Sequence, residues 1–217
     1  MKKPRLILIF FGPPGSGKGT QTDRLGAELK LPVISTGELL RHEESLKSAL
    51  GVKARRYIKK GDLVPDELIH AMMAGRLAKK DTAKGFILDG YPRDQHQLYD
   101  LLQLTKDDNI WLIEIKVKDR EVLNRISGRR ICDNCGASYH LVYSPPKKPG
   151  ICDACGKKIT IREDDKPAVV HERLAQYKAT AKPLGSFGRK IRHLIIINGE
   201  QSINKVYKDI LKQIRNL

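Results

Sequence analysis

The feature that most constrains the fold of this chain is a glycine-rich stretch at residues 12–20, with the sequence GPPGSGKGT. It follows an apolar run at residues 6–11 and opens a segment with helical periodicity. A strand, a glycine-rich loop and a helix in this order are typical of a phosphate-binding loop (P-loop). Its glycines let backbone N–H groups turn toward one anion, the helix adds its positive end, and Lys18 supplies a mobile charge. The stretch therefore predicts binding of a nucleoside triphosphate.

Short apolar runs elsewhere in the chain alternate with segments of helical spacing. The runs at residues 6–11, 86–88, 110–117 and 194–197 indicate buried strands of a mostly parallel sheet, and residues 32–35 are a weaker fifth. This alternation predicts a P-loop α/β fold: a doubly wound, five-stranded parallel sheet flanked by helices, with its ligand at the carboxyl ends of the strands. The 217 residues suffice for one core and a small insertion, so we expect a single domain over residues 1–217.

All four cysteines fall within residues 128–165, which we call the cysteine segment. The segment has no helical period and is rich in proline and glycine, so it indicates a small insertion in the main fold. Its spacing, C-x2-C, sixteen residues and C-x2-C, suits four thiolates around one Zn²⁺. Four sulfur ligands leave no open position, so the expected zinc is structural. A pair of disulfides, a redox switch or a nucleic-acid zinc ribbon are alternatives. The ligands are Cys132, Cys135, Cys152 and Cys155.

The chain is strongly basic, with a formal net charge of +16 from 41 Lys and Arg and 25 Asp and Glu. Such a field attracts polyanions, both nucleotides and nucleic acids. The basic residues are dispersed, so no dedicated nucleic-acid partner is expected, although an ATP-dependent nucleic-acid-binding protein stays as an alternative. No apolar run approaches the roughly 18 residues of a membrane-spanning helix, and the first is too short for a signal peptide. We therefore expect a cytoplasmic protein with no membrane partner.

Arginines stand near the ends of several predicted elements. Phosphoryl transfer between nucleotides needs alignment and positive charge more than a general base, because the accepting phosphate oxygen is already anionic. Taken singly, each arginine is more often a solvated surface residue. Together with the phosphate loop and the cysteines, the set resembles the adenylate kinase family, in its long-lid, zinc-containing bacterial type. The resemblance runs from the loop to about Arg173 and is carried by Arg41, Arg93, Arg129, Arg162 and Arg173.

The resemblance implies the reversible reaction ATP + AMP = 2 ADP, catalysed by a monomer whose partners are ATP, AMP and ADP. It implies catalytic roles for Lys18, Arg93, Arg129, Arg162 and Arg173. It also implies that Asp89, at the end of a predicted strand, fixes Mg²⁺ through water. The implied ATP-binding residues are Gly15, Ser16, Gly17, Lys18, Gly19, Thr20, Arg125, Arg129, Ser138, Tyr139 and Gln201.

On the acceptor side, the resemblance implies a helical AMP-binding subdomain at residues 35–64 and a zinc-binding lid at residues 128–165. A UMP or CMP kinase is the nearest alternative, and Thr36, Gln97 and the zinc insertion argue against it. The implied AMP-binding residues are Thr36, Arg41, Asp62, Leu63, Val64, Gly90, Tyr91, Pro92, Arg93, Gln97, Arg162 and Arg173.

The chain departs from the family pattern at Glu38, where Asp is usual, and at Lys166-Pro167-Ala168. The neighbouring acids Asp164 and Asp165 leave two interpretations open. Asp165 caps the helix that begins near Pro167, or the pair serves at the hinge of the lid.

Overall fold

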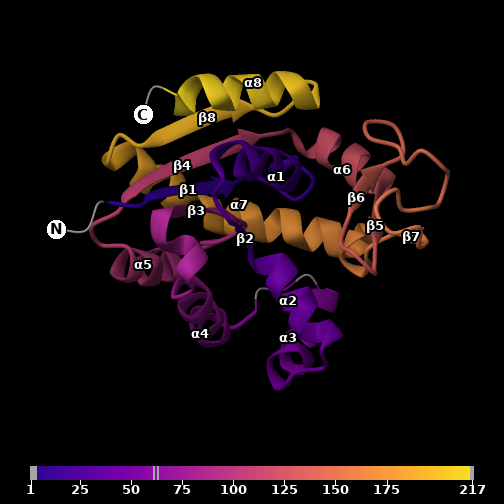
Figure 1. Cartoon of the computed structure of the whole chain (residues 1–217), viewed down its shortest axis with the longest axis horizontal. Helices are drawn as coiled ribbons and strands as arrows, with labels where there is room; N and C mark the ends of the chain where they lie inside the picture. The colour runs from indigo at the N-terminus through magenta and orange to yellow at the C-terminus, as the bar shows by residue number, and fades with distance from the viewer. Residues whose placement is uncertain (1–3, 61, 63, 216–217) are drawn as a thin grey trace.

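The computed structural model describes residues 4–60, 62 and 64–215, apart from the side chains of residues 58 and 59. Its central sheet is parallel, with the strand order β2-β3-β1-β4-β8 (Figure 1). All five apolar runs expected to be strands are strands, which confirms the predicted five-stranded parallel sheet. The strands are β1 (Leu6–Phe11), β2 (Val33–Ser35), β3 (Gly85–Asp89), β4 (Asn109–Lys116) and β8 (Leu194–Asn198).

The middle strand β1 is buried on both faces because helices cover the sheet from either side. Ile7 and Ile9 point into one apolar cluster, while Leu8 and Phe10 point into the other, and all four are fully buried. This two-sided burial explains why the strand is a continuous apolar run rather than an alternating pattern.

Helices α1 (Lys18–Leu29) and α8 (Ile203–Ile214) cover one face of the sheet, and α4 (Asp66–Leu77), α5 (Gln95–Leu104) and α7 (Pro167–Lys190) cover the other (Figure 1). Helix α6 (Asp119–Gly128) packs against α7. The fold is therefore doubly wound, as predicted. Within the described part of the chain, no helix has the length and apolar character needed to cross a membrane.

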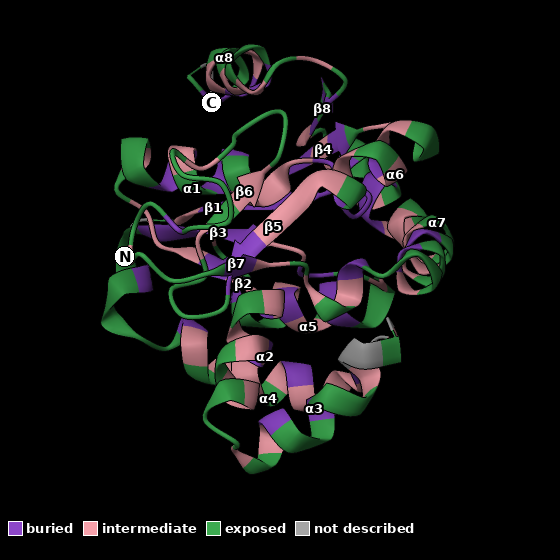
Figure 2. Ribbon diagram, turned by 90° about the vertical axis from the view of Figure 1, so that its right-hand side faces the viewer, coloured by how far each residue is buried: buried purple, intermediate pink, exposed green. Residues whose placement is uncertain are grey.

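Two smaller pieces lie beyond the carboxyl ends of the strands (Figure 1). One is the helix pair α2 (Thr36–Ser45) and α3 (Ala49–Lys60). The other is the cysteine segment, which contains a three-stranded antiparallel sheet of order β6-β5-β7 that the sequence analysis did not foresee. Figure 2 shows this segment facing the viewer, with burial concentrated at one end of β5. Its strands are β5 (Arg129–Cys132), β6 (Ser138–His140) and β7 (Ile159–Thr160). Short 3-10 helices lie before β3, at η1 (Lys80–Lys84), and before α7, at η2 (Glu163–Asp165).

Candidate functional site

A cavity of about 1410 Å³ lies where the central strands end, between the phosphate loop (residues 12–20), α2 and the cysteine segment. Apart from Tyr91, every described residue that the sequence analysis assigned to ATP, AMP or magnesium lines it. Leu63 lies outside the described residues. The side chain of Tyr91 is 1% exposed and packs in the apolar core, where its hydroxyl donates to the carbonyl of Gln97 at 3.3 Å. Residues from distant parts of the sequence thus meet in one cavity.

The phosphate loop connects β1 to α1 through backbone conformations that favour glycine. Gly12 has φ 152° and Gly15 has φ 70°. A Cβ at Gly12 would lie 2.5 Å from the carbonyl oxygen of Ile115, and one at Gly15 would lie 2.7 Å from Cγ1 of Ile126. Close packing on β4 and α6 therefore excludes larger residues. Because α1 begins at Lys18, the positive end of its dipole is directed at the cavity.

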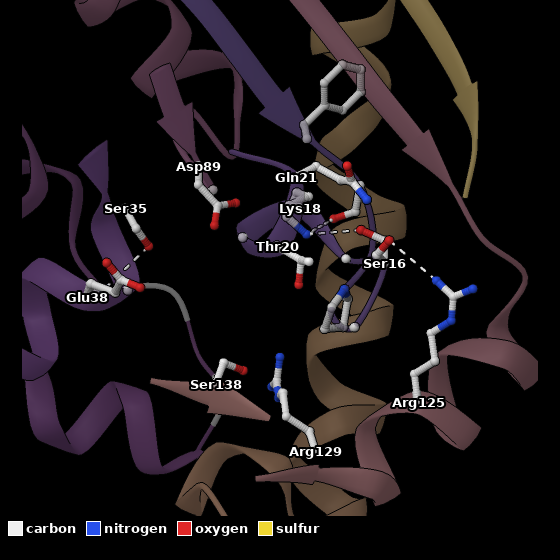
Figure 3. Close-up of a pocket in the computed structure, with 18 of the residues that line it drawn as sticks. Ser16, Lys18, Thr20, Gln21, Ser35, Glu38, Asp89, Arg125, Arg129 and Ser138 are labelled. Carbon is white, nitrogen blue, oxygen red and sulfur yellow. Dashed lines mark hydrogen bonds between the residues drawn. The ribbon is translucent and has the colours of Figure 1, made fainter. Parts of the chain in front are cut away.

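Lys18 is held by the loop itself. Its Nζ donates to the carbonyl oxygens of Gly12 and Pro13, both at 2.9 Å, and lies 3.4 Å from Oγ of Ser16. Burial lowers the pKa of Lys18 to about 8, against the opposing effect of Asp89 and together with repulsion from the cavity arginines. Figure 3 shows Lys18, Thr20 and Asp89 close together, with Arg129 and Ser138 reaching toward them from the cysteine segment. The ammonium group is therefore in place to exchange carbonyl partners for phosphate oxygens.

The arginines of the cavity lower one another's pKa values. Burial, followed by repulsion from Arg173, lowers the pKa of Arg93 to about 10. Burial, followed by repulsion from Arg129 and Arg41, lowers the pKa of Arg162 to about 10. The side chain of Arg162 forms no hydrogen bond or ion pair with a described residue, and its Nε is buried. This concentration of poorly compensated cations is suited to a polyphosphate.

Asp164 and Asp165 bind arginines of the cavity and cap no helix. Asp165, whose side chain is 0% exposed, accepts hydrogen bonds from Arg129, and Arg173 donates to Oδ2 of Asp164 at 2.8 Å. The N-cap residue of α7 is Lys166, which makes no side-chain capping bond. The capping interpretation of Asp165 is therefore wrong. Burial disfavours the charge on Arg129, but its bonds to Asp165 outweigh this and raise its pKa.

Asp89, Glu38 and Asp23 are among the acidic residues that line the same cavity. Asp89 ends β3, and its carboxylate forms no hydrogen bond or ion pair with a described residue. Its Oδ2 would lie 3.5 Å from a Cβ placed at Gly19. Its free oxygens are hard ligands of the kind that Mg²⁺ and its waters prefer. Burial and repulsion from Glu38 and Asp89 raise the pKa of Asp23 to about 6. The sequence analysis missed Asp23, although its position three residues after Thr20 on α1 places both on one helix face.

Across the cavity from the phosphate loop, hydrogen bonds to backbone and side-chain amide groups position the residues predicted to bind AMP. Thr36 Oγ1 and Arg93 Nε both donate to the carbonyl of Gly90, at 3.0 and 2.9 Å. Gln97, 3% exposed, accepts from the backbone N–H of Arg93 at 2.9 Å and donates to Asp66 Oδ1 at 2.9 Å. Asp66 was not singled out in the sequence, and no motif there identifies it. The amide of Gln97 therefore joins the loop that carries Arg93 to the start of α4.

The loop between β8 and α8 closes the cavity near the phosphate loop. Arg125 donates to the carbonyl of Gly199 at 2.8 Å, which ties this loop to α6. The side-chain amide of Gln201 donates to the carbonyl of Asn198 at 2.8 Å and to Asp209 at 3.0 Å. Gln21, which the sequence analysis missed, is 3% exposed and donates to the carbonyl of Ile203 at 3.1 Å. The loop is thus fixed to both α1 and α6.

The four cysteine sulfurs lie within 4.8 Å of one another. The sulfurs of Cys132 and Cys155 are 3.4 Å apart, and those of Cys135 and Cys152 are 3.5 Å apart. These separations are too long for disulfides and close to the roughly 3.8 Å between corners of a tetrahedral zinc–thiolate site. A hydrogen bond from Tyr139, with backbone N–H groups of Cys155 and Ala154, lowers the pKa of Cys152 to about 6. The donor set and its spacing therefore fit Zn²⁺.

Comparison with known proteins places the chain among one group of enzymes. The family model described as adenylate kinase matches residues 10–192. The adenylate kinase of Methanocella arvoryzae is 45% identical over 212 residues, which cover 96% of this chain and 98% of that relative. The adenylate kinase of Archaeoglobus fulgidus is 44% identical over 206 residues, covering 94% and 95%. That of Caldicellulosiruptor bescii is 42% identical over 210 residues, covering 94% and 97%.

Proposed function

Since the chain belongs to the adenylate kinase family, we propose how its residues divide the work of the family reaction. The protein is a nucleoside monophosphate kinase that catalyses ATP + AMP = 2 ADP. The observation that carries the division of roles is the meeting of Lys18, the phosphate loop and five arginines in one cavity. The matches do not favour a UMP or CMP kinase or an ATP-dependent nucleic-acid-binding protein.

The donor ATP is bound by the phosphate loop and the cysteine segment. Backbone N–H groups of residues 15–20 receive its phosphates, and Lys18 exchanges the carbonyls of Gly12 and Pro13 for phosphate oxygens. Arg125, Ser138, Tyr139 and Gln201 complete the donor side. Asp89 holds the water shell of Mg²⁺, an ion that neutralises charge on the transferred group when it is bound with ATP.

The acceptor AMP lies on the side of α2 and β3. Thr36, Arg41, Val64 and Gln97 line this part of the cavity. Arg93 faces the transferred group there because the carbonyl of Gly90 and the side chain of Gln97 fix its position. Asp62, Gly90, Pro92 and, outside the described residues, Leu63 are the further acceptor contacts.

The transfer step requires no general base. An oxygen of the AMP phosphate attacks the γ-phosphorus of ATP as the bond to the β-phosphate oxygen breaks, so ADP leaves on one side and ADP forms on the other. Arg93, Arg129, Arg162 and Arg173 stabilise the charge spread over the transferred oxygens. Their mutual repulsion without nucleotide is relieved when the phosphates arrive.

The two peripheral pieces act as moving covers. Residues 35–64 form the AMP-binding subdomain, and the cysteine segment, residues 128–165, is a lid held together by structural Zn²⁺. Closure of the lid brings Arg129 and Arg162 over the phosphates and excludes water, which would otherwise compete as acceptor. Because one chain supplies the residues on every side of the cavity, a monomer suffices for the reaction.

Phosphorus NMR tests the proposed substrate assignment. Purified protein with Mg-ATP is given AMP, GMP, CMP or UMP in separate samples, and the diphosphate that forms is followed. Two ADP per ATP with AMP, and little turnover with the other monophosphates, is the expected result. ADP with free phosphate, or preferred turnover of CMP or UMP, would contradict the assignment.

A further inference from the structure

The zinc ligand Cys152 has a hydrogen-bond partner that comes from the nucleotide side of the cysteine segment. Oη of Tyr139 lies 3.3 Å from Sγ of Cys152. The same Oη accepts a hydrogen bond from the backbone N–H of Asp153 at 2.7 Å. Among the hydrogen bonds of the described residues, Tyr139 is the one side chain, cysteines aside, that bonds a cysteine sulfur.

The chemistry of the groups fixes the direction of this hydrogen bond. A phenol has one O–H donor, and a lone pair of this oxygen already accepts from Asp153. A thiolate that binds zinc carries no proton and can only accept. The hydroxyl of Tyr139 therefore donates to the sulfur of Cys152 when the metal is bound.

Tyr139 also lies where the zinc site and the nucleotide cavity meet. Its ring packs against the buried cluster of Cys132, Cys152 and Ile159. Its strand, β6, pairs with β5 so that Tyr139 lies opposite Arg130, one residue from Arg129. Ser138 and Tyr139 both line the cavity. One residue thus contacts a metal ligand through its side chain and belongs to the strand beside the nucleotide.

We propose that Tyr139 is an outer-sphere residue of the zinc site, whose hydroxyl donates to the Cys152 thiolate and so fixes strand β6 to the metal centre. The inference rests on the proposed structural zinc. Outer-sphere partners of metal ligands orient the ligand and tune its basicity, and their loss weakens metal binding about 10- to 100-fold. Tyr139 is therefore a positioning residue, by which the metal holds the nucleotide-facing strand in place.

The test compares the full-length wild type, Tyr139→Phe and Tyr143→Phe, each loaded with Zn²⁺. Tyr143 is a matched control because it lies in the same segment, is 53% exposed, and its hydroxyl bonds no described residue. Zinc release is timed by transfer to the chromogenic chelator 4-(2-pyridylazo)resorcinol. We expect release from Tyr139→Phe to be at least about tenfold faster than from the wild type, and release from Tyr143→Phe to be unchanged.

A spectroscopic signature separates this role from general loosening of the segment. With Co²⁺ in place of Zn²⁺, loss of a hydrogen bond to sulfur raises the energy of the sulfur lone pair. The sulfur-to-cobalt charge-transfer band of Tyr139→Phe should therefore move to longer wavelength, while that of Tyr143→Phe stays in place. Equal zinc release and identical cobalt spectra in all three proteins would overturn the inference and leave the structural zinc standing. A wild type that binds no zinc would overturn the zinc proposal itself.

Discussion

The phosphate loop and the cysteine segment form opposite walls of one cavity, but different interactions stabilise their structures. The loop follows a strand whose residues Ile7–Phe10 are fully buried, and packing on Ile115 and Ile126 fixes its glycines. The cysteine segment has short strands and few buried apolar groups, and Leu141, Val142, Tyr143, Ile151 and Ile161 are exposed. The hydrophobic core therefore stabilises the loop, whereas the proposed zinc site would have to stabilise the segment.

On the proposed function, this difference lets one domain combine a fixed phosphate loop with a lid that moves. The loop needs no ligand to hold Lys18, since backbone carbonyls already do so. A segment without a large apolar core can move as a small body, provided that a metal keeps it folded. Four predictions test this contrast between the loop and the segment.

Removal of the metal has the largest expected effect, and this effect should be confined to the cysteine segment. A chelator should unfold the cysteine segment and abolish phosphoryl transfer, because structural zinc supplies much of the folding free energy of such elements. The sheet should then unfold in a separate, later thermal transition. Calorimetry with and without chelator measures this, with magnesium kept in excess as the control. An unchanged thermal melt would contradict the proposal.

Arginine deletions on the two walls should cost comparable activity. Arg93→Ala removes a cation from the loop between β3 and α5. Arg129→Ala removes one from the cysteine segment. Each should lower turnover at least about a hundredfold, by analogy with lost charge-stabilising donors. Arg130→Ala is the control, since among the described residues its side chain bonds only the carbonyls of Ser127 and Arg129, and it is not part of the cavity lining. Steady-state kinetics provide the test, and near-normal rates for either cavity variant would remove that arginine from the mechanism.

The ion pairs at the base of the cysteine segment should contribute less. Asp165→Asn leaves Arg129 and Arg173 without the carboxylate that both approach, which should destabilise the protein by about 3 kcal/mol. Asp119→Asn is a matched control, because Asp119 pairs with Lys178 and both side chains are more than half exposed, 51% and 60%. It should cost less than about 0.5 kcal/mol. Urea unfolding measures both, and equal effects would show that the Asp165 pairs are no stronger than a surface pair.

The smallest expected effect is a pH dependence of the phosphate loop. Lys18 has a lowered pKa of about 8 in the free protein, so it is charged below this pH and loses its proton above it. The kcat/KM for ATP should therefore fall about tenfold per pH unit above 8. The kcat/KM for AMP at saturating ATP should stay level to higher pH, because bound phosphates favour the charged lysine. Parallel profiles for the two substrates would exclude Lys18 as the titrating group.

Local patterns in the sequence predicted the parts of the molecule that depend on local chemistry. Buried parallel strands are continuous apolar runs, so β1 was expected with the bounds that it has. The glycines and Lys18 identify the loop because phosphate binding requires these residues at this spacing. The cysteine spacing predicted a cluster of sulfurs, which the structure contains.

Features that depend on distant contacts could not be predicted in this way. The strand pairing of Ile131 with Ser138 and Thr160 occurs in a segment whose sequence has no apolar period to indicate it. Asp165 follows the pattern of a helix cap, but Arg129, 36 positions earlier in the sequence, and Arg173 compete for its carboxylate and bind it. Gln21 lies in an ordinary helix pattern, and its bond to Ile203 joins residues 182 positions apart.

The most direct test of the contrast between the walls is hydrogen exchange, followed by mass spectrometry, of zinc-loaded and zinc-stripped protein. Removal of zinc should strip protection from residues 128–165, while peptides from β1, β3 and β4 and from the phosphate loop exchange as before. Loss of protection throughout the sheet, or unchanged protection in residues 128–165, would contradict this expectation.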